Sequence, residues 1–212
     1  MEKFEKFKPT DYGIIDFKYP ILLPALKNSQ KKKLYIASDH GGFELKEYIK
    51  DLAIKRGYEY VKSDSEHLEF SDDGHYVIDI GTHSDERCDY PIYGFELGQK
   101  ISEDPGNSCG VAICKSGNGI GNSLNINPGV ISSNGLTAED IETNIIHNRS
   151  NVLVLPASVV DKNKASVLFD SFLDFELDLR GINEAYLRRH LIQIMNEYKI
   201  VGKGRHPLVQ DD

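Results

Sequence analysis

Short apolar runs alternate with amphipathic segments along most of this chain. Residues 34–37 form one such run, and residues 43–54 follow it with apolar side chains at the spacing of a helix that has one buried face. The same order recurs at residues 110–113 and 120–125. Because neighbouring parallel strands need a crossover between them, usually a helix, the alternation predicts a parallel sheet covered by helices on both faces.

One domain is expected to carry this pattern. A chain of 212 residues can bury one large core, and the alternation begins near Lys33 and continues to about residue 200. We therefore expect an N-terminal extension over residues 1–32, a single domain over residues 33–200 and a C-terminal tail over residues 201–212. Residues 62–76 are polar and acidic and are predicted to form a surface insertion.

The composition limits the partners and the compartment. With 33 acidic and 25 basic residues the formal charge is -8, which argues against a nucleic-acid or anionic-membrane surface. No segment reaches the roughly 18 apolar residues that a membrane-spanning helix needs. The three cysteines show no Cys-x-x-Cys pair, so the sequence indicates neither a metal site nor a disulfide framework. We expect a cytoplasmic protein.

Residues 110–125 carry the most informative motif. An apolar run ends at Cys114, a glycine-rich loop follows, and a helix is expected to begin directly afterwards. This order places a thiol at the carboxyl end of a strand, beside main-chain N–H groups that can bind an anion. Lys115 and the helix start both favour the thiolate, the reactive form, whereas Cys88 and Cys109 have no such setting and are interpreted as structural. The alternative for Cys114 is an unreactive core cysteine.

The glycine-rich loop has a rival interpretation as a dinucleotide-binding fingerprint. The match is weak, because Asn122 stands where the third glycine is required, and the acidic residues Glu139 and Asp140 fall at a helix start instead of a strand end. A phosphate loop of the Walker type is excluded, since no Gly-Lys-Ser/Thr follows. The motif therefore favours a small, negatively charged substrate.

Three further groups of residues are candidates for the same site. Asp39 and His40 follow the first strand, where the alternative is a helix cap beside a surface histidine. His147 lies near a helix end, where a lone histidine is more often structural, and it becomes a candidate acid or base only if it approaches the thiol. Basic residues near the C-terminus usually face solvent, but one or more of the following could bind phosphate: Arg180, Arg188 and Arg189.

Four segments match one known family in the right order. They are residues 36–46 (IASDHGGFELK), 80–91 (IGTHSDERCDYP), 110–125 and 147–153 (HNRSNVL). The chain thus resembles the ribose-5-phosphate isomerase B and galactose-6-phosphate isomerase family over about residues 33–200. The resemblance implies a Rossmann-like three-layer α/β/α sandwich with a mostly parallel central sheet of about five strands. It also implies a homodimer or tetramer that interconverts aldose and ketose phosphates without a metal or cofactor.

The resemblance also implies roles for single residues. Cys114 would be the base that moves a proton between C2 and C1 of the sugar, and His147 would open the sugar ring. The loop after the cysteine would hold the enediolate intermediate through its amides. Active sites in this family are shared between subunits, so His147 and a C-terminal arginine are expected to serve the Cys114 of a neighbour. The expected substrate-binding residues are Asp39, His40, Tyr90, Lys115, Ser116, Gly117, Asn118, Gly119, Asn148 and Arg189.

Several positions depart from the family pattern. Lys115 stands where glycine is usual, Ser158 where a substrate-contacting arginine is common, and Ala185 where a phosphate-binding arginine is expected. Ile120 replaces the glutamate base of some relatives, so the cysteine must be the base here. We expect isomerisation of ribose 5-phosphate to ribulose 5-phosphate. Two alternatives stay open: another aldose phosphate such as galactose or allose 6-phosphate, or a catalytically silent partner subunit that binds sugar phosphates.

Overall fold

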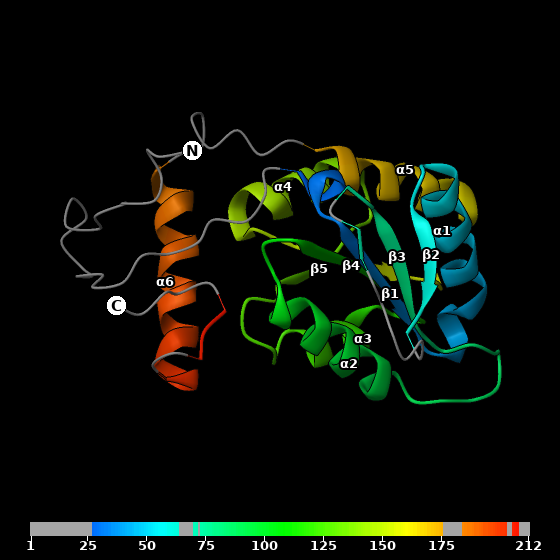
Figure 1. Cartoon of the computed structure of the whole chain (residues 1–212), viewed down its shortest axis with the longest axis horizontal. Helices are drawn as coiled ribbons and strands as arrows, with labels where there is room; N and C mark the ends of the chain where they lie inside the picture. The colour runs from blue at the N-terminus through cyan, green and yellow to red at the C-terminus, as the bar shows by residue number, and fades with distance from the viewer. Residues whose placement is uncertain (1–26, 64–69, 72, 176–183, 203–204, 208–212) are drawn as a thin grey trace.

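The computed structural model describes residues 27–63, 70–71, 73–175, 184–202 and 205–207. In this part of the chain one sheet of six strands forms the core, with the order β2-β3-β1-β4-β6-β5 and every neighbouring pair parallel (Figure 1). The predicted α/β class and the parallel sheet are confirmed. The strands are β1 (Lys33–Ser38), β2 (Glu59–Lys62), β3 (Tyr76–Gly81), β4 (Ser108–Cys114), β5 (Ser132–Asn134) and β6 (Val152–Pro156).

The sheet has six strands where about five were expected. Both edge strands are short and polar, with the sequences EYVK in β2 and SSN in β5. Such segments lack the apolar run that identifies a buried strand, so their pairing depends on the neighbouring strands. The four central strands are almost completely buried, as expected for strands that are covered on both faces.

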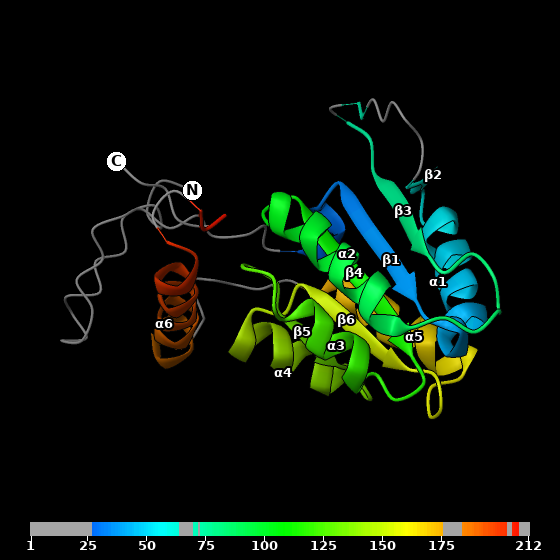
Figure 2. The same cartoon turned by 90° about the horizontal axis from the view of Figure 1, so that it is seen from below.

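Helices cover both faces of the sheet and complete the predicted three layers (Figures 1 and 2). Each face has its own apolar core, formed by alternate residues of the strands and the inner sides of the helices. None of the described helices is both long enough and apolar enough to cross a membrane. The helices are α1 (Phe43–Lys55), α4 (Ala138–Asn148) and α5 (Lys162–Asp174) on one face, and α2 (Tyr90–Glu103) and α3 (Asn118–Leu124) on the other.

The strand order reverses between β1 and β4, the two strands at the centre of the sheet. The helix after β1 covers one face and the helix after β4 covers the other, so the loops at their carboxyl ends part in opposite directions. In open α/β sheets a ligand normally binds at this point. The two loops touch here, because the Asp39 N–H donates to the Ile113 carbonyl at 3.3 Å and a Cβ on Gly41 would lie 3.6 Å from the Cβ of Lys115.

A further helix, α6 (Glu184–Val201), lies beside the sandwich and packs against α4 (Figure 1). Its apolar residues Leu191 and Ile194 are buried. The Glu197 carboxylate accepts a hydrogen bond from the N–H of Gly129 at 2.9 Å. The helix is therefore tied both to α4 and to the segment that precedes β5.

The predicted extension, insertion and tail fall partly outside the described residues. Of the extension, residues 27–32 are described, and the Asn28 side chain donates to the Phe172 carbonyl of α5 at 3.0 Å. Residues 1–26, residues 64–69 and 72 of the insertion, and residues 203–204 and 208–212 of the tail lie outside the described part, as does the candidate Arg180. The domain boundaries stay a prediction.

Candidate active site

Cys114 is the last residue of β4, and only 3% of it is exposed. Its sulfur accepts a hydrogen bond from the N–H of Gly117 at 3.2 Å, which is the contact needed to stabilise a thiolate when one forms. This contact requires a tight turn between Cys114 and Gly117. The turn is possible because Gly117 has a φ of 77°, in the left-handed region. A side chain at this glycine would also lie 2.5 Å from the Asn134 amide oxygen, so the turn requires glycine on two grounds.

The loop after Cys114 presents its side chains to solvent and leads straight into α3. Lys115, Ser116 and Asn118 are exposed, whereas Gly117 is buried. The first N–H groups of a helix have no partner within the helix, so this loop can offer several donors to one anion. Gly119 lies under the ring of Tyr90, since a Cβ added there would be 2.6 Å from the Tyr90 Cζ.

Asp39 and His40 stand next to this loop at the end of β1. The Asp39 carboxylate is buried and accepts the N–H of Gly42 at 3.1 Å, so it shapes the turn. The His40 ring is exposed, and its Nδ1 lies 2.9 Å from the Cys88 carbonyl oxygen. The helix-cap interpretation of Asp39 is therefore correct, and the same turn aims His40 at the segment that leads to Tyr90.

His147, Asn148 and Arg189 form a second group, at the end of α4. The His147 and Tyr186 rings stack with their centroids 4.0 Å apart, and the Arg189 guanidinium carbon lies 5.3 Å from the centroid of the Tyr186 ring. Asn148 donates to the Asn144 side chain at 3.4 Å. The side chain of the other described candidate, Arg188, is partly buried, and its Nε has no hydrogen-bond partner among the residues that the structure describes.

The two groups lie apart within one chain. β4 and β6 end side by side, since Cys114 pairs with Pro156, whereas α4 runs back from the end of β5 toward the start of β6. A strand such as β6, with 5 residues, spans about 16 Å. His147, in the last turn of α4, therefore lies toward the amino edge of the sheet, and within the described residues no hydrogen bond, ion pair or ring contact joins it to Cys114.

Comparison with known proteins decides the family. The family model described as Ribose/Galactose Isomerase matches residues 57–189. The chain is also 33% identical over 146 residues to a protein named probable ribose-5-phosphate isomerase B from Mycoplasma pneumoniae, across 68% of this chain and 84% of that protein. The chain belongs to the ribose/galactose isomerase family. It is accordingly an aldose–ketose isomerase of sugar phosphates, as the resemblance implied.

Other relatives agree with this membership in the ribose/galactose isomerase family. Ribose-5-phosphate isomerase B of Escherichia coli is 30% identical over 142 residues, across 67% of this chain and 83% of that protein. The solved structure of the Clostridium thermocellum ribose-5-phosphate isomerase B is 28% identical and has a TM-score of 0.65, covering 79% of this chain and 99% of that one. The Mycoplasma genitalium enzyme with bound ribulose-5-phosphate, at 23% identity and a TM-score of 0.66, supports the shared fold, with coverage of 79% and 97%.

A chain of asparagines joins the two residue groups on the surface of this family member, and the sequence did not indicate it. The Asn134 side chain donates to the Asn118 side chain at 3.0 Å. Asn144 donates to the Asn134 carbonyl at 3.2 Å and accepts from Asn148. The polar sequence of β5 is the one sequence feature related to this chain of asparagines, and by itself it does not indicate which side chains are hydrogen-bonded.

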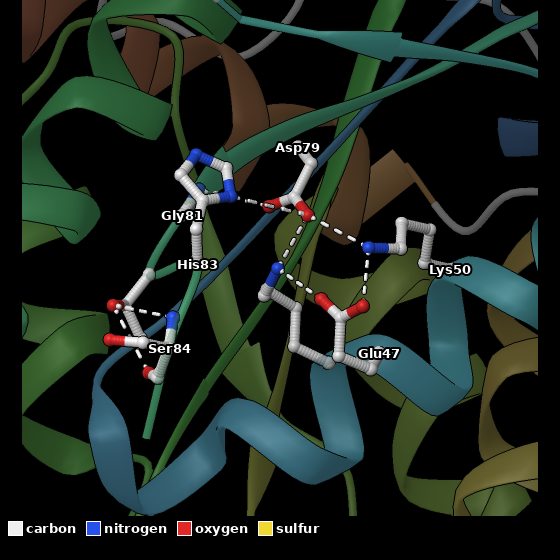
Figure 3. Close-up of polar contacts among 8 residues, drawn as sticks. Glu47, Lys50, Asp79, Gly81, His83 and Ser84 are labelled. Atoms are coloured by element: carbon white, nitrogen blue, oxygen red, sulfur yellow. Dashed lines mark hydrogen bonds and ion pairs between the residues drawn. The ribbon is translucent and has the colours of Figure 1, made fainter. Parts of the chain in front are cut away.

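A buried ion-pair network supports the Asp39–His40 side of the site (Figure 3). The Asp79 carboxylate in β3 is fully buried and contacts the fully buried Lys46 ammonium of α1 at 2.5 Å and Lys50 at 3.3 Å. Its other oxygen accepts the N–H of Gly81 at 2.9 Å, and Glu47 completes the network from the solvent side. The network thereby fixes the end of β3, from which the chain continues to the segment that contacts His40.

The remaining cysteines differ from Cys114 in their surroundings. Cys109 lies in the same strand but is completely buried, and burial raises the pKa of its thiol to about 12 in spite of the opposing charge of Lys31. Such a thiol stays protonated and unreactive. Cys88 is partly buried and contacts the site through its main chain. Cys114 is therefore the cysteine whose setting fits proton transfer.

Proposed function

We propose that this protein interconverts ribose 5-phosphate and ribulose 5-phosphate through a cis-enediolate, with Cys114 as the base. The observation that carries the proposal is the position of the Cys114 sulfur, which lies at the strand-order reversal, beside an amide-lined loop and next to Asp39 and His40. The names of the relatives, ribose-5-phosphate isomerase B, support the five-carbon substrate.

The chemistry follows from these groups. The Cys114 thiolate removes the proton on C2 of the open-chain aldose and returns it to C1, while the oxygen on C1 gains a proton and the oxygen on C2 loses one. Between the two steps, negative charge develops on the sugar oxygens. The amides of the loop over residues 115–119 would stabilise that charge, and one such donor is typically worth about 3 kcal/mol. Asp39, His40 and Tyr90 would orient the sugar.

A second subunit would complete the site. His147 would open the sugar ring, but its own chain keeps it away from Cys114, so a shared site needs the His147 of a neighbouring copy. Arg189 contacts the Tyr186 ring that stacks on His147. Arg189 would therefore reach the same active site of the neighbouring subunit as His147 and bind the phosphate there. The minimal assembly is a homodimer with two shared sites.

The substrate is tested by measuring isomerisation of five- and six-carbon aldose phosphates by the wild-type protein. We expect the highest kcat/KM with ribose 5-phosphate. Activity confined to six-carbon phosphates would instead support the galactose or allose 6-phosphate alternative. Binding of sugar phosphates without turnover would support the silent partner subunit.

Mixing two inactive variants tests the shared site. Cys114→Ser and His147→Ala are each expected to lack activity alone. When equal amounts are unfolded and refolded together, about half of the dimers are mixed and each contains one intact site, so about a quarter of the wild-type activity should return. A mixture as inactive as its components would show that both groups act within one chain. Two Cys114→Ser preparations mixed in the same way are the control.

Lys115 is predicted to add positive charge at the rim of the site. It is exposed at the contact between the two loops, and its carbonyl accepts the N–H of Ser158, which stands where the family commonly has a substrate-contacting arginine. Lys115→Ala should lower kcat/KM about three- to tenfold, mostly through KM, because a charge-assisted contact to phosphate is lost. The matched control is Lys55→Ala, an exposed lysine at the far end of α1, which changes the net charge equally. Equal kinetics of the two variants would rule out a role for Lys115 in binding.

A further inference from the structure

The ring of Tyr186 contacts both His147 and Arg189, the two residues that α4 and α6 would contribute to the site. We propose that Tyr186 is a positioning residue that holds the His147 imidazole in the orientation needed for ring opening, an inference that rests on the proposed function.

The stack fixes the plane of the imidazole. The two rings lie at 30° to each other with centroids 4.0 Å apart, within the range of attractive aromatic pairs. A stacked ring is held by its face, so both ring nitrogens at its edge stay available for substrate. Within the described residues, no hydrogen bond restrains the His147 ring, and the stack is therefore the contact that orients it.

The two helices hold the partners of the stack in place. Ile145 of α4 is buried, as are Leu191 and Ile194 of α6, and the Glu197 carboxylate accepts the Gly129 N–H. His190 fills the same interface as a neutral ring, because burial, reinforced by the charge of Arg149, lowers its pKa to about 4. Since both backbones are anchored, the remaining freedom of His147 is rotation of its side chain, which the tyrosine ring restricts.

The arrangement also links ring opening to phosphate binding. The guanidinium carbon of Arg189 lies 5.3 Å from the Tyr186 ring centroid, the distance of a cation–π contact. One ring thus sets the positions of an acid–base group and a phosphate-binding group. A misplacement of about 1 Å in such groups can cost 100-fold in rate.

The experiment compares a cyclic with an open-chain substrate. Ribose 5-phosphate closes its ring through the C4 hydroxyl, so its 4-deoxy analogue stays open and needs no ring opening. Tyr186→Leu should lower kcat/KM about 10- to 100-fold on ribose 5-phosphate. On the analogue, which needs no ring opening and loses only the contact between Tyr186 and Arg189, the loss should be about two- to fivefold. Tyr186→Phe keeps the ring and should match the wild type on both substrates. His147→Ala should show the selective loss more strongly.

Other results would overturn the proposal. An equal loss on both substrates, or no loss on either, shows that Tyr186 does not act through ring opening. If His147→Ala shows the selective loss while Tyr186→Leu does not, the inference alone fails. If the wild type isomerises neither substrate, or if His147→Ala affects both equally, the proposed function fails instead. Circular dichroism checks folding, and Tyr186→Gln, a good helix former without a ring, provides the same comparison if the leucine variant is unstable.

Discussion

Cys114→Ser is expected to abolish isomerisation while leaving the fold intact. A serine hydroxyl at this position can accept the same hydrogen bond from Gly117 and fits the same buried space, so little stability should be lost. It is, however, far too weak an acid to be ionised and to serve as the base. Loss of a positioned base typically costs 100- to 10,000-fold, and we expect kcat to fall by about 1,000-fold or more.

The matched control is Cys109→Ser. It makes the same chemical change in the same strand, at a thiol that is completely buried and held protonated. This variant should keep the wild-type kcat, with any loss confined to thermal stability. Both variants would be assayed with ribose 5-phosphate after their melting curves have been recorded. A folded Cys114→Ser protein with more than about a tenth of the wild-type kcat would contradict the cysteine-base mechanism.

The position of the thiol could be predicted because it depends on local order. An apolar strand that ends in cysteine and continues into a glycine loop places the side chain at the carboxyl edge of a parallel sheet, whichever strands flank it. The adjacency of Asp39 to this loop follows in the same way, since β1 also ends at that edge. Short-range pattern and parallel topology were sufficient for this half of the site.

The other half of the site, around His147, depends on contacts between segments that are distant in sequence. Nothing near His147 shows that Tyr186 of a later helix will stack on its ring. The strand β5 was hard to recognise for a related reason, since its polar sequence takes up strand geometry only beside β6. Patterns within a segment cannot encode which neighbour it will meet.

The buried network at Asp79 is a second case in which the sequence does not reveal a contact between distant segments. Residues 77–80 are apolar except for Asp79, and Lys46 belongs to the predicted helix over residues 43–54. A carboxylate inside an apolar strand indicates that a partner must exist, because a buried charge without one is very costly. The sequence does not indicate that this partner is Lys46, because α1 and β3 meet only in the folded protein.

Asp79→Asn should therefore destabilise the protein strongly. The amide has the same shape, but it leaves the Lys46 ammonium buried beside a neutral group, with only the half-exposed Glu47 as a counter-charge. Breaking a buried pair on one side typically costs 3 to 5 kcal/mol, and we expect the free energy of unfolding to fall by about 3 kcal/mol. The measurement is urea unfolding followed by circular dichroism, with the m-value compared between variants.

Two further variants distinguish the stability lost by breaking the buried ion pair from the stability that any Asp→Asn substitution would cost. Asp170→Asn makes the same change in the surface ion pair with Arg56, where the side chains are 50% and 31% exposed, and it should cost less than about 1 kcal/mol. Lys46→Met together with Asp79→Asn removes both charges of the buried pair, and Lys50 keeps Glu47 as its partner. The double variant should therefore be more stable than Asp79→Asn alone. If Asp79→Asn costs no more than Asp170→Asn, the network does not hold the end of β3, and the support of the Asp39–His40 side must come from apolar packing alone.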